Sequence, residues 1–229
     1  MKRSRINALI EEAKELFASA GFNLPPFAFW TPEEWKSKGH EVDEIRRNAL
    51  GWDVTDFGSR DFDRTGLLLF TIRNGNYHHS DEYPKPYAEK IMAVKENQVT
   101  PYHFHWKKQE DIINRGGGDL VLDLYKSTKD EKLSNESFSV SIDGVQRKCK
   151  PGERVVLKPG ESICLEPFIY HKFYGASGKG TVVVGEVSAV NDDNTDNRFL
   201  DAPGRFPKIE EDEPPVHLLC NEYPPAQSR

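Results

Sequence analysis

The sequence predicts an all-β core that follows an N-terminal helical extension, within a single domain. Its 229 residues are the length of one large domain. Strand-length apolar runs follow one another from about residue 65 to residue 190, and glycine-containing turns separate them. Many short strands with frequent turns favour an antiparallel sandwich or barrel over alternating βα units. We therefore divide 1–229 into a helical extension (1–55), a β-barrel (65–190) and a C-terminal tail (191–229).

The first fifty residues carry the helix signals. Apolar residues recur at three- and four-residue spacing over residues 6–17, which indicates one amphipathic helix. Thr31 can cap a second helix, because Pro32 suits its first position and Glu34 completes a capping box. A third short helix is expected within residues 43–50.

Seven apolar runs predict the strands. Turn pairs such as Asn74-Gly75 and Pro159-Gly160 lie between them. A hairpin is expected at 139–146, closed by Asp143-Gly144. The expected strands are 66–72, 88–94, 120–125, 137–142, 154–157, 162–165 and 181–187. The polar, then proline-rich and acidic tail is expected to wrap the surface or a partner subunit.

Charge and composition argue against several classes of protein. The 37 acidic and 31 basic side chains give a net charge of -6, so a nucleic-acid or polybasic membrane partner is not expected. No apolar run approaches the roughly 18 residues that span a bilayer. Acidic residues at positions 11, 12 and 15 interrupt what would be a signal peptide. Three widely spaced cysteines without a CxxC pair favour reduced thiols and a cytoplasmic location.

Two histidines separated by one residue, His103 and His105, suggest a metal site. On a strand they point to the same side, so two imidazoles could hold one ion. Glu110 has the wrong parity for an uninterrupted strand, and it can join them only if the backbone bends within residues 106–109. A solvated strand face is the alternative explanation of this pattern.

A second segment, residues 158–171, holds a Pro-Gly turn, a strand and a proline-bounded loop that ends in His171. The order HxHx4Ex6G, followed by PG, six residues, P, three residues and H, resembles the two paired motifs of the cupin superfamily. The resemblance implies a double-stranded β-helix, or jelly-roll, barrel. It also implies that His103, His105, Glu110 and His171 bind a divalent metal.

This ligand set narrows the choice of metal. Three imidazoles and one carboxylate suit Mn, Fe, Co, Ni or Zn, and are too rich in nitrogen for Mg or Ca. On an octahedral ion, four protein ligands leave two adjacent positions. Such a site could chelate the hydroxy-carbonyl unit of an open-chain sugar, or an enediol that awaits dioxygen.

Over most of its length the sequence also resembles the cupin-type D-lyxose isomerases, a family of sugar ketol-isomerases. The match is carried by PYHFHWKKQEDIINRGGGDL, LEPFIYHKFYG and VVVGEVSAVNDDNTDNRF. It implies interconversion of D-lyxose with D-xylulose and of D-mannose with D-fructose, with Mn²⁺ as the usual metal. Lys90, Glu110, Asp192 and Arg198 are then expected to bind the sugar.

Aldose–ketose isomerisation needs a group that moves a proton between C1 and C2. Glu186 is the candidate base, because it shares a strand face with Val184, where an unpaired carboxylate is costly. Lys90 shares a face with Val94 and is the second catalytic candidate, since a cation there could stabilise charge on a sugar oxygen. The alternatives are a surface-facing Glu186 and a lysine whose charged end reaches solvent.

Two other functions remain open on the sequence alone. One is a cupin dioxygenase that uses Fe(II) with the same four ligands, and the other is a non-catalytic sugar-binding module. The expected partner is a monosaccharide, without nucleic acid or membrane. A homodimer is expected, because exposed barrel edges need cover and the helices and tail could supply it to a neighbour.

Overall fold

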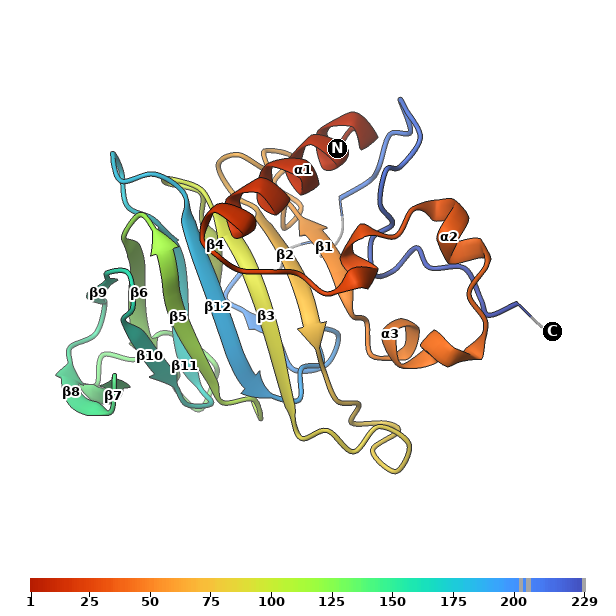
Figure 1. Cartoon of the computed structure of the whole chain (residues 1–229). Helices are drawn as coiled ribbons and strands as arrows, with labels where there is room; N and C mark the ends of the chain where they lie inside the picture. The colour runs from red at the N-terminus through yellow and green to blue at the C-terminus, as the bar shows by residue number, and fades with distance from the viewer. Residues whose placement is uncertain (202–203, 205–206, 228–229) are drawn as a thin grey trace.

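The computed structural model describes residues 1–201, 204 and 207–227. Two antiparallel sheets pack face to face and form the predicted β core (Figure 1). The larger sheet has the order β1-β2-β3-β12-β5-β10-β7-β8, and the smaller has the order β13-β4-β11-β6-β9. The strands are β1 (Gly51–Thr55), β2 (Leu67–Arg73), β3 (Tyr87–Val94), β4 (Thr100–Phe104), β5 (Glu110–Gly117), β6 (Leu120–Lys126), β7 (Phe138–Ile142), β8 (Val145–Cys149), β9 (Glu153–Leu157), β10 (Ser162–Leu165), β11 (Ile169–Gly175), β12 (Val182–Ala189) and β13 (Arg198–Phe199).

The predicted N-terminal helices are present. They are α1 (Arg3–Ser19), α2 (Pro32–Lys36) and α3 (Asp43–Arg47), with 3-10 turns η1 (Pro26–Phe29) and η2 (His40–Val42). The capping box of α2 is confirmed: the Thr31 side chain accepts from the Glu34 N–H, and the Glu34 side chain accepts from the Thr31 N–H. The apolar face of α1 packs on the outer face of β2 and β3 (Figure 1).

The helical extension ends earlier than residue 55. Residues 51–55 form β1, the edge strand of the larger sheet. Trp52 and Val54 are buried with the α1 face, while Asp53 points to the cavity on the other side of the sheet. Two apolar residues in five are too weak a signal to predict a strand from the sequence. Residues 51–55 form a strand because their apolar side chains pack against α1.

Two further differences from the sequence predictions concern the strands. Residues 110–117 form β5, which no apolar run had indicated. His171 does not end a loop but lies inside β11. In agreement with the expectation that the tail wraps the surface, its described part packs against α1 of its own chain, for example through the pairing of Lys2 with Glu210. The hairpin is confirmed as β7 and β8, and Asp143 and Gly144 adopt the positive φ values of a tight hairpin turn.

The strand register brings distant sequence segments to one place between the sheets. In the larger sheet β12 pairs with β3, which sets Glu186 opposite Lys90. In the smaller sheet β11 pairs with β4, which sets His171 opposite His103. Among the residues that the structure describes, no helix is both long and apolar enough to cross a membrane.

Candidate active site

A cavity of about 350 Å³ lies between the two sheets. Side chains from both sheets and from residues 193–199 line it. This volume is within the range of small-molecule binding sites. The four residues of the cupin pattern, Lys90 and Glu186 all lie on its wall, so the register has gathered six of the expected site residues.

The four side chains of the cupin pattern form one buried cluster. His103 is in β4, His105 follows that strand directly, Glu110 begins β5 and His171 is in β11. One ligand atom from each lies within 4.8 Å of the others. The chain turns at residues 106–109 between β4 and β5, as the parity of Glu110 requires. A solvated HxH face is therefore wrong, since all four residues are buried.

Each imidazole of the cluster is oriented by a backbone carbonyl at its Nδ1 atom. His103 Nδ1 is 2.8 Å from Pro101 O, and His171 Nδ1 is 3.0 Å from Ile169 O. His105 Nδ1 is 2.7 Å from Asp196 O. A carbonyl only accepts, so each Nδ1 carries the proton and each Nε2 lone pair is free to face the cluster.

The cluster fits a divalent cation. His105 Nε2, His171 Nε2 and Glu110 Oε1 are buried polar atoms without a hydrogen bond among the described residues. Glu110 Oε1 lies 3.3 Å from His105 Nε2 and 3.0 Å from His171 Nε2, and it forms no hydrogen bond with either atom. Burial and the neighbouring imidazoles lower the pKa of His103 well below its ordinary value, which keeps it a neutral ligand. One ion at this point would satisfy the lone pairs that the fold leaves buried.

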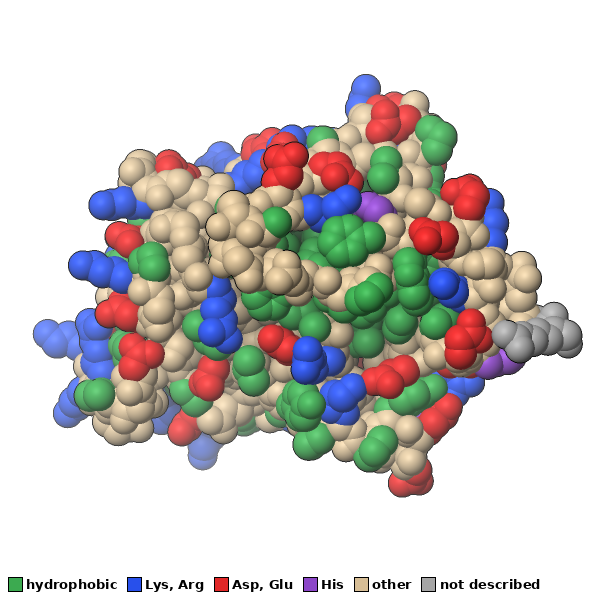
Figure 2. Space-filling model, viewed as in Figure 1, with side chains coloured by type: hydrophobic (Ala, Val, Ile, Leu, Met, Phe, Trp, Pro, Cys, Tyr) green, Lys and Arg blue, Asp and Glu red, His purple; other side chains and the backbone are tan. Residues whose placement is uncertain are grey.

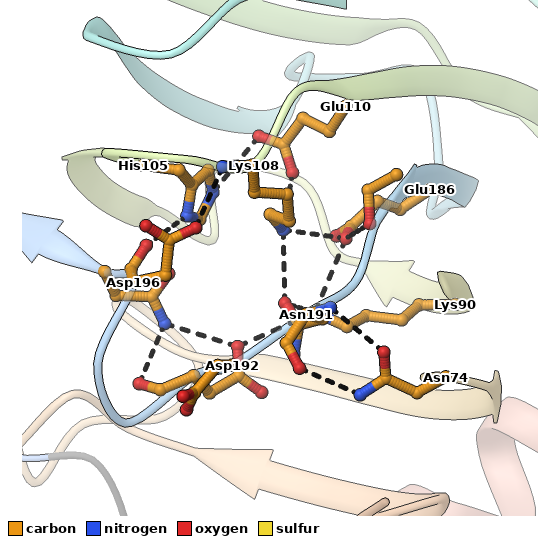
Figure 3. Close-up of polar contacts among 12 residues, drawn as sticks. Asn74, Lys90, His105, Lys108, Glu110, Glu186, Asn191, Asp192 and Asp196 are labelled. Atoms are coloured by element: carbon orange, nitrogen blue, oxygen red, sulfur yellow. Dashed lines mark hydrogen bonds and ion pairs between the residues drawn. The ribbon is translucent and has the colours of Figure 1, made fainter. Parts of the chain in front are cut away.

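Lys108, which the sequence analysis did not single out, joins the cluster to the candidate base (Figure 3). Its Nζ lies 2.8 Å from Glu110 Oε2 and 2.8 Å from Glu186 Oε1. Lys90 Nζ lies 3.5 Å from the same Glu186 oxygen, and both lysines donate to Asn191 Oδ1. The only signal for Lys108 was its position between two ligands, and a lysine pair in a turn is ordinarily solvated.

Opposite charges keep Glu110, Glu186 and Lys108 ionised. Burial alone would raise the pKa of Glu186, but Lys108 and Lys90 hold it below its ordinary value. Burial would likewise raise the pKa of Glu110, and Lys108 with two imidazoles holds it well below the usual range. The two carboxylates in turn raise the pKa of Lys108 despite its burial. Glu186 and Lys90 thus face the cavity as an ion pair. Glu186 is therefore not on the surface, and the charged end of Lys90 does not reach solvent.

Asp192 and Arg198 do not line the cavity. Asp192 accepts from Thr195 Oγ1 and from two backbone N–H groups in its own turn. Arg198 donates from Nε to Glu131 Oε2 at 2.7 Å. The segment that holds these two residues presents three other polar side chains to the cavity, those of Asp193, Asn194 and Asn197. Asp53 in β1 and Thr100 in β4, which the sequence did not indicate, also line the cavity.

A jelly-roll barrel with a buried cluster of three histidines and one glutamate defines a cupin protein that could hold a divalent ion. The model of the D-lyxose isomerase family matches residues 1–223. The chain belongs to this family.

Relatives and solved structures agree with that assignment. The chain is 50% identical to the D-lyxose/D-mannose isomerase of Serratia proteamaculans, over 97% of this chain and 98% of the relative. It is 48% identical to the protein of the same name from Escherichia coli O157:H7, over the same shares. Two L-ribose isomerases share the fold. That of Acinetobacter sp. with L-ribose has a TM-score of 0.63 at 15% identity, and that of Geodermatophilus obscurus has 0.61 at 17%; each comparison covers 92% of this chain and 98% of the other.

The chain is therefore a sugar aldose–ketose isomerase, an intramolecular oxidoreductase. This confirms the isomerase prediction over the dioxygenase and the sugar-binding module.

Proposed function

We propose that this enzyme interconverts D-lyxose with D-xylulose and D-mannose with D-fructose. The substrates follow the names of relatives about half identical over nearly the whole chain. The observation that carries the proposal is the placement of the Glu186 carboxylate in one cavity with the His103–His105–Glu110–His171 cluster, with Lys108 in contact with both.

We infer that His103, His105, Glu110 and His171 hold the metal, and that the metal is Mn²⁺, with Fe, Co, Ni and Zn as substitutes. The support is the donor set of three imidazoles and one carboxylate, together with the buried Nε2 and Oε1 atoms that an ion would satisfy. When bound, a divalent ion polarises two neighbouring sugar oxygens and makes the adjacent C–H group more acidic.

Glu186 then moves the proton. Its pKa lies below the ordinary value, so the carboxylate is in its base form at neutral pH before a sugar enters. It takes the proton from C2 of the aldose, which leaves an enediolate with its negative charge on O1. The hydroxyl proton of O2 passes to O1, and Glu186 returns a proton to C1 to give the ketose. Lys90, 3.5 Å from the same carboxylate oxygen, stabilises negative charge on a sugar oxygen during both transfers.

We propose that Lys90 and Glu110 bind the sugar and that Asp192 and Arg198, which were also expected to bind it, instead position the wall of the cavity. Lys90 and Glu110 line the cavity and can contact the sugar as the structure stands. Asp192 and Arg198 act on the sugar through the segment that they fix, since Asp193, Asn194 and Asn197 on that segment line the cavity.

Metal dependence and activity can be tested together. Purified protein should convert D-lyxose and D-mannose to their ketoses after Mn²⁺ loading, and lose that activity when a chelator removes the metal. His171→Ala should lose bound Mn²⁺ and nearly all turnover. His79→Ala, at an exposed loop histidine, is the matched control and should retain both. A His171→Ala protein with stoichiometric metal and full activity would refute the ligand assignment.

We also propose that the chain acts as a single domain in a cytoplasmic homodimer. Its three cysteines are free thiols, which suits a reducing compartment. Hydrophobic side chains gather on one face between α1 and α2 (Figure 2). Phe29 in η1, which lies between these helices in the sequence, is 46% exposed. The outer strand β9 of the smaller sheet also exposes Val156. Sedimentation of a dimer at micromolar concentration would support this assembly, and a monomer would overturn it.

A further inference from the structure

Asp196 is a buried carboxylate that is absent from the proposed catalytic, metal-binding and sugar-binding groups. It lies in the segment between β12 and β13, with 2% of its surface exposed. Its Oδ1 accepts from the backbone N–H groups of Trp106 and Lys107 at 3.0 and 2.9 Å. Its Oδ2 accepts from the backbone N–H of Lys108 at 2.9 Å. One side chain therefore holds three successive N–H groups of the turn between β4 and β5. Figure 3 shows Asp196 beside His105 and Lys108.

The backbone of the same residue orients one member of the cluster. Asp196 O accepts from His105 Nδ1 at 2.7 Å, across 91 positions of sequence. His103 and His171 use carbonyls two residues earlier on their own strands. Of the three imidazoles, His105 is thus the one whose orientation depends on a separate segment of the chain.

These contacts join two parts of the site. Asp196 fixes the ring of His105 through its carbonyl and the backbone of Lys108 through its carboxylate. Its neighbours Asp193, Asn194 and Asn197 line the cavity. The segment can shift away from the turn only if all four hydrogen bonds break.

We propose that Asp196 is a positioning residue that sets His105 for metal binding and couples the cavity wall to the metal cluster. This inference rests on the proposed metal site. The partners that orient metal ligands typically contribute about 10- to 100-fold to metal affinity. Without the Asp196 carboxylate, the three N–H groups lose their acceptor and the segment no longer holds its carbonyl against His105.

The test is the Mn²⁺ affinity of Asp196→Asn and Asp196→Ala, measured by electron paramagnetic resonance titration of the metal-stripped full-length chain. In Asp196→Asn an amide NH₂ replaces one acceptor oxygen and faces a backbone donor, while the side-chain shape is kept. We expect both variants to bind Mn²⁺ about 10- to 100-fold more weakly, with Asp196→Ala the weaker. The absorption spectrum of bound Co²⁺ should also change in Asp196→Asn, because the ring of His105 is no longer fixed.

Glu96→Gln is the matched control. The Glu96 carboxylate also accepts from backbone N–H groups, those of Gly178 and Gly180 at 2.8 and 2.5 Å, but it does not line the cavity. This variant should lose stability and keep its Mn²⁺ affinity. An equal loss of affinity in Glu96→Gln would show that general destabilisation explains the effect.

The proposal is overturned if Asp196→Asn binds Mn²⁺ within about twofold of the unaltered chain and keeps the same Co²⁺ spectrum, whatever Asp196→Ala does. Failure of the proposed metal site is distinguishable, because the unaltered chain would then bind no Mn²⁺. If Asp196→Ala does not fold, Asp196→Asn alone decides the outcome.

Discussion

A single lysine organises the charges of the site. Lys108 lies between the carboxylates of Glu110 and Glu186 and is 3% exposed. A buried carboxylate without a nearby cation would take up a proton, since burial favours its neutral form. Lys108 therefore keeps Glu110 available as a ligand and Glu186 available as a base.

Replacing Lys108 with Met tests this role through the pH profile. Burial raises the pKa of Glu186 and Lys108 is its largest opposing influence, so the pKa of Glu186 should rise in the variant. The base form is then lost at a higher pH, and the acid limb of the profile of kcat/KM should move to higher pH. Lys107→Met, at the neighbouring exposed lysine whose Nζ lies over the ring of Tyr77, is the control and should leave the limb in place. An unmoved limb in Lys108→Met would contradict this account.

Sequence predicts the residues of the site where local spacing carries the information. Strand parity placed His103 and His105 on one side and required the bend before Glu110, and the structure has both. Lys108 escaped prediction because its burial depends on carboxylates from β5 and β12. These strands are neighbours in the sheet but about 75 residues apart in sequence.

At the scale of elements, turn pairs and apolar runs in the sequence predicted the apolar strands. Strands that mix polar and apolar residues were predicted poorly. The run 162–165 is β10 and the hairpin closes at Asp143-Gly144. By contrast β11, with the sequence IYHKFYG, alternates between cavity and surface and has a lysine and a histidine among its aromatics. This segment forms a strand because it pairs with β4 on one side and with β6 on the other. The local sequence pattern does not indicate this pairing.

The smaller sheet offers a test of charge across strands. Asp123 in β6 contacts Arg154 of β9 at 2.8 Å and Lys172 of β11 at 2.9 Å. Burial alone would raise the pKa of Asp123, but these two cations hold it below its ordinary value. A lowered folded-state pKa stabilises the protein above the unfolded value of about 3.9, and this stability is lost as the pH falls through the folded value.

Asp123→Asn should therefore lower the free energy of unfolding by about 1 kcal/mol at pH 7. The difference from the unaltered protein should shrink below about pH 4, because the carboxylate is then protonated in both states. Urea unfolding at a series of pH values measures this difference. A difference that stays constant from pH 7 to pH 3 would exclude the charge as its cause.

On the scale of the whole molecule, the two ends of the chain are tied together against the larger sheet. Arg3 in α1 is 2% exposed and binds the carboxylates of Glu211 and Glu222 in the tail. Asn7 donates to Glu213 and accepts from the N–H of Val216. The sequence did not predict this contact, because an arginine near the N-terminus and acidic residues near the C-terminus look like separate solvated segments.

Arg3→Met should lower the free energy of unfolding by about 2 kcal/mol, since it leaves two carboxylates without their shared partner. Turnover at 25 °C should stay the same, because the cavity lies between the sheets and α1 packs on the outer face. Arg5→Met removes a more exposed pair with Glu12 and Asp63 and should cost less than about 1 kcal/mol. Equal losses in the two variants, measured by urea unfolding, would contradict the role given to Arg3.

We propose above all that Glu186 transfers a proton within the sugar, beside the metal cluster. The most direct measurement is proton magnetic resonance of the D-xylulose formed from D-lyxose in deuterium oxide by the Mn²⁺-loaded enzyme and by its Glu186→Gln variant. We expect deuterium at C1 of the ketose, because the proton that Glu186 carries can exchange with the solvent before it is returned. Turnover should be about 10²- to 10⁴-fold lower in Glu186→Gln, with its metal content unchanged. Glu89→Gln, on the paired strand β3 and bound to Arg73, should react as the unaltered enzyme does. A ketose free of deuterium, or a Glu186→Gln enzyme with near-normal turnover, would contradict the claim.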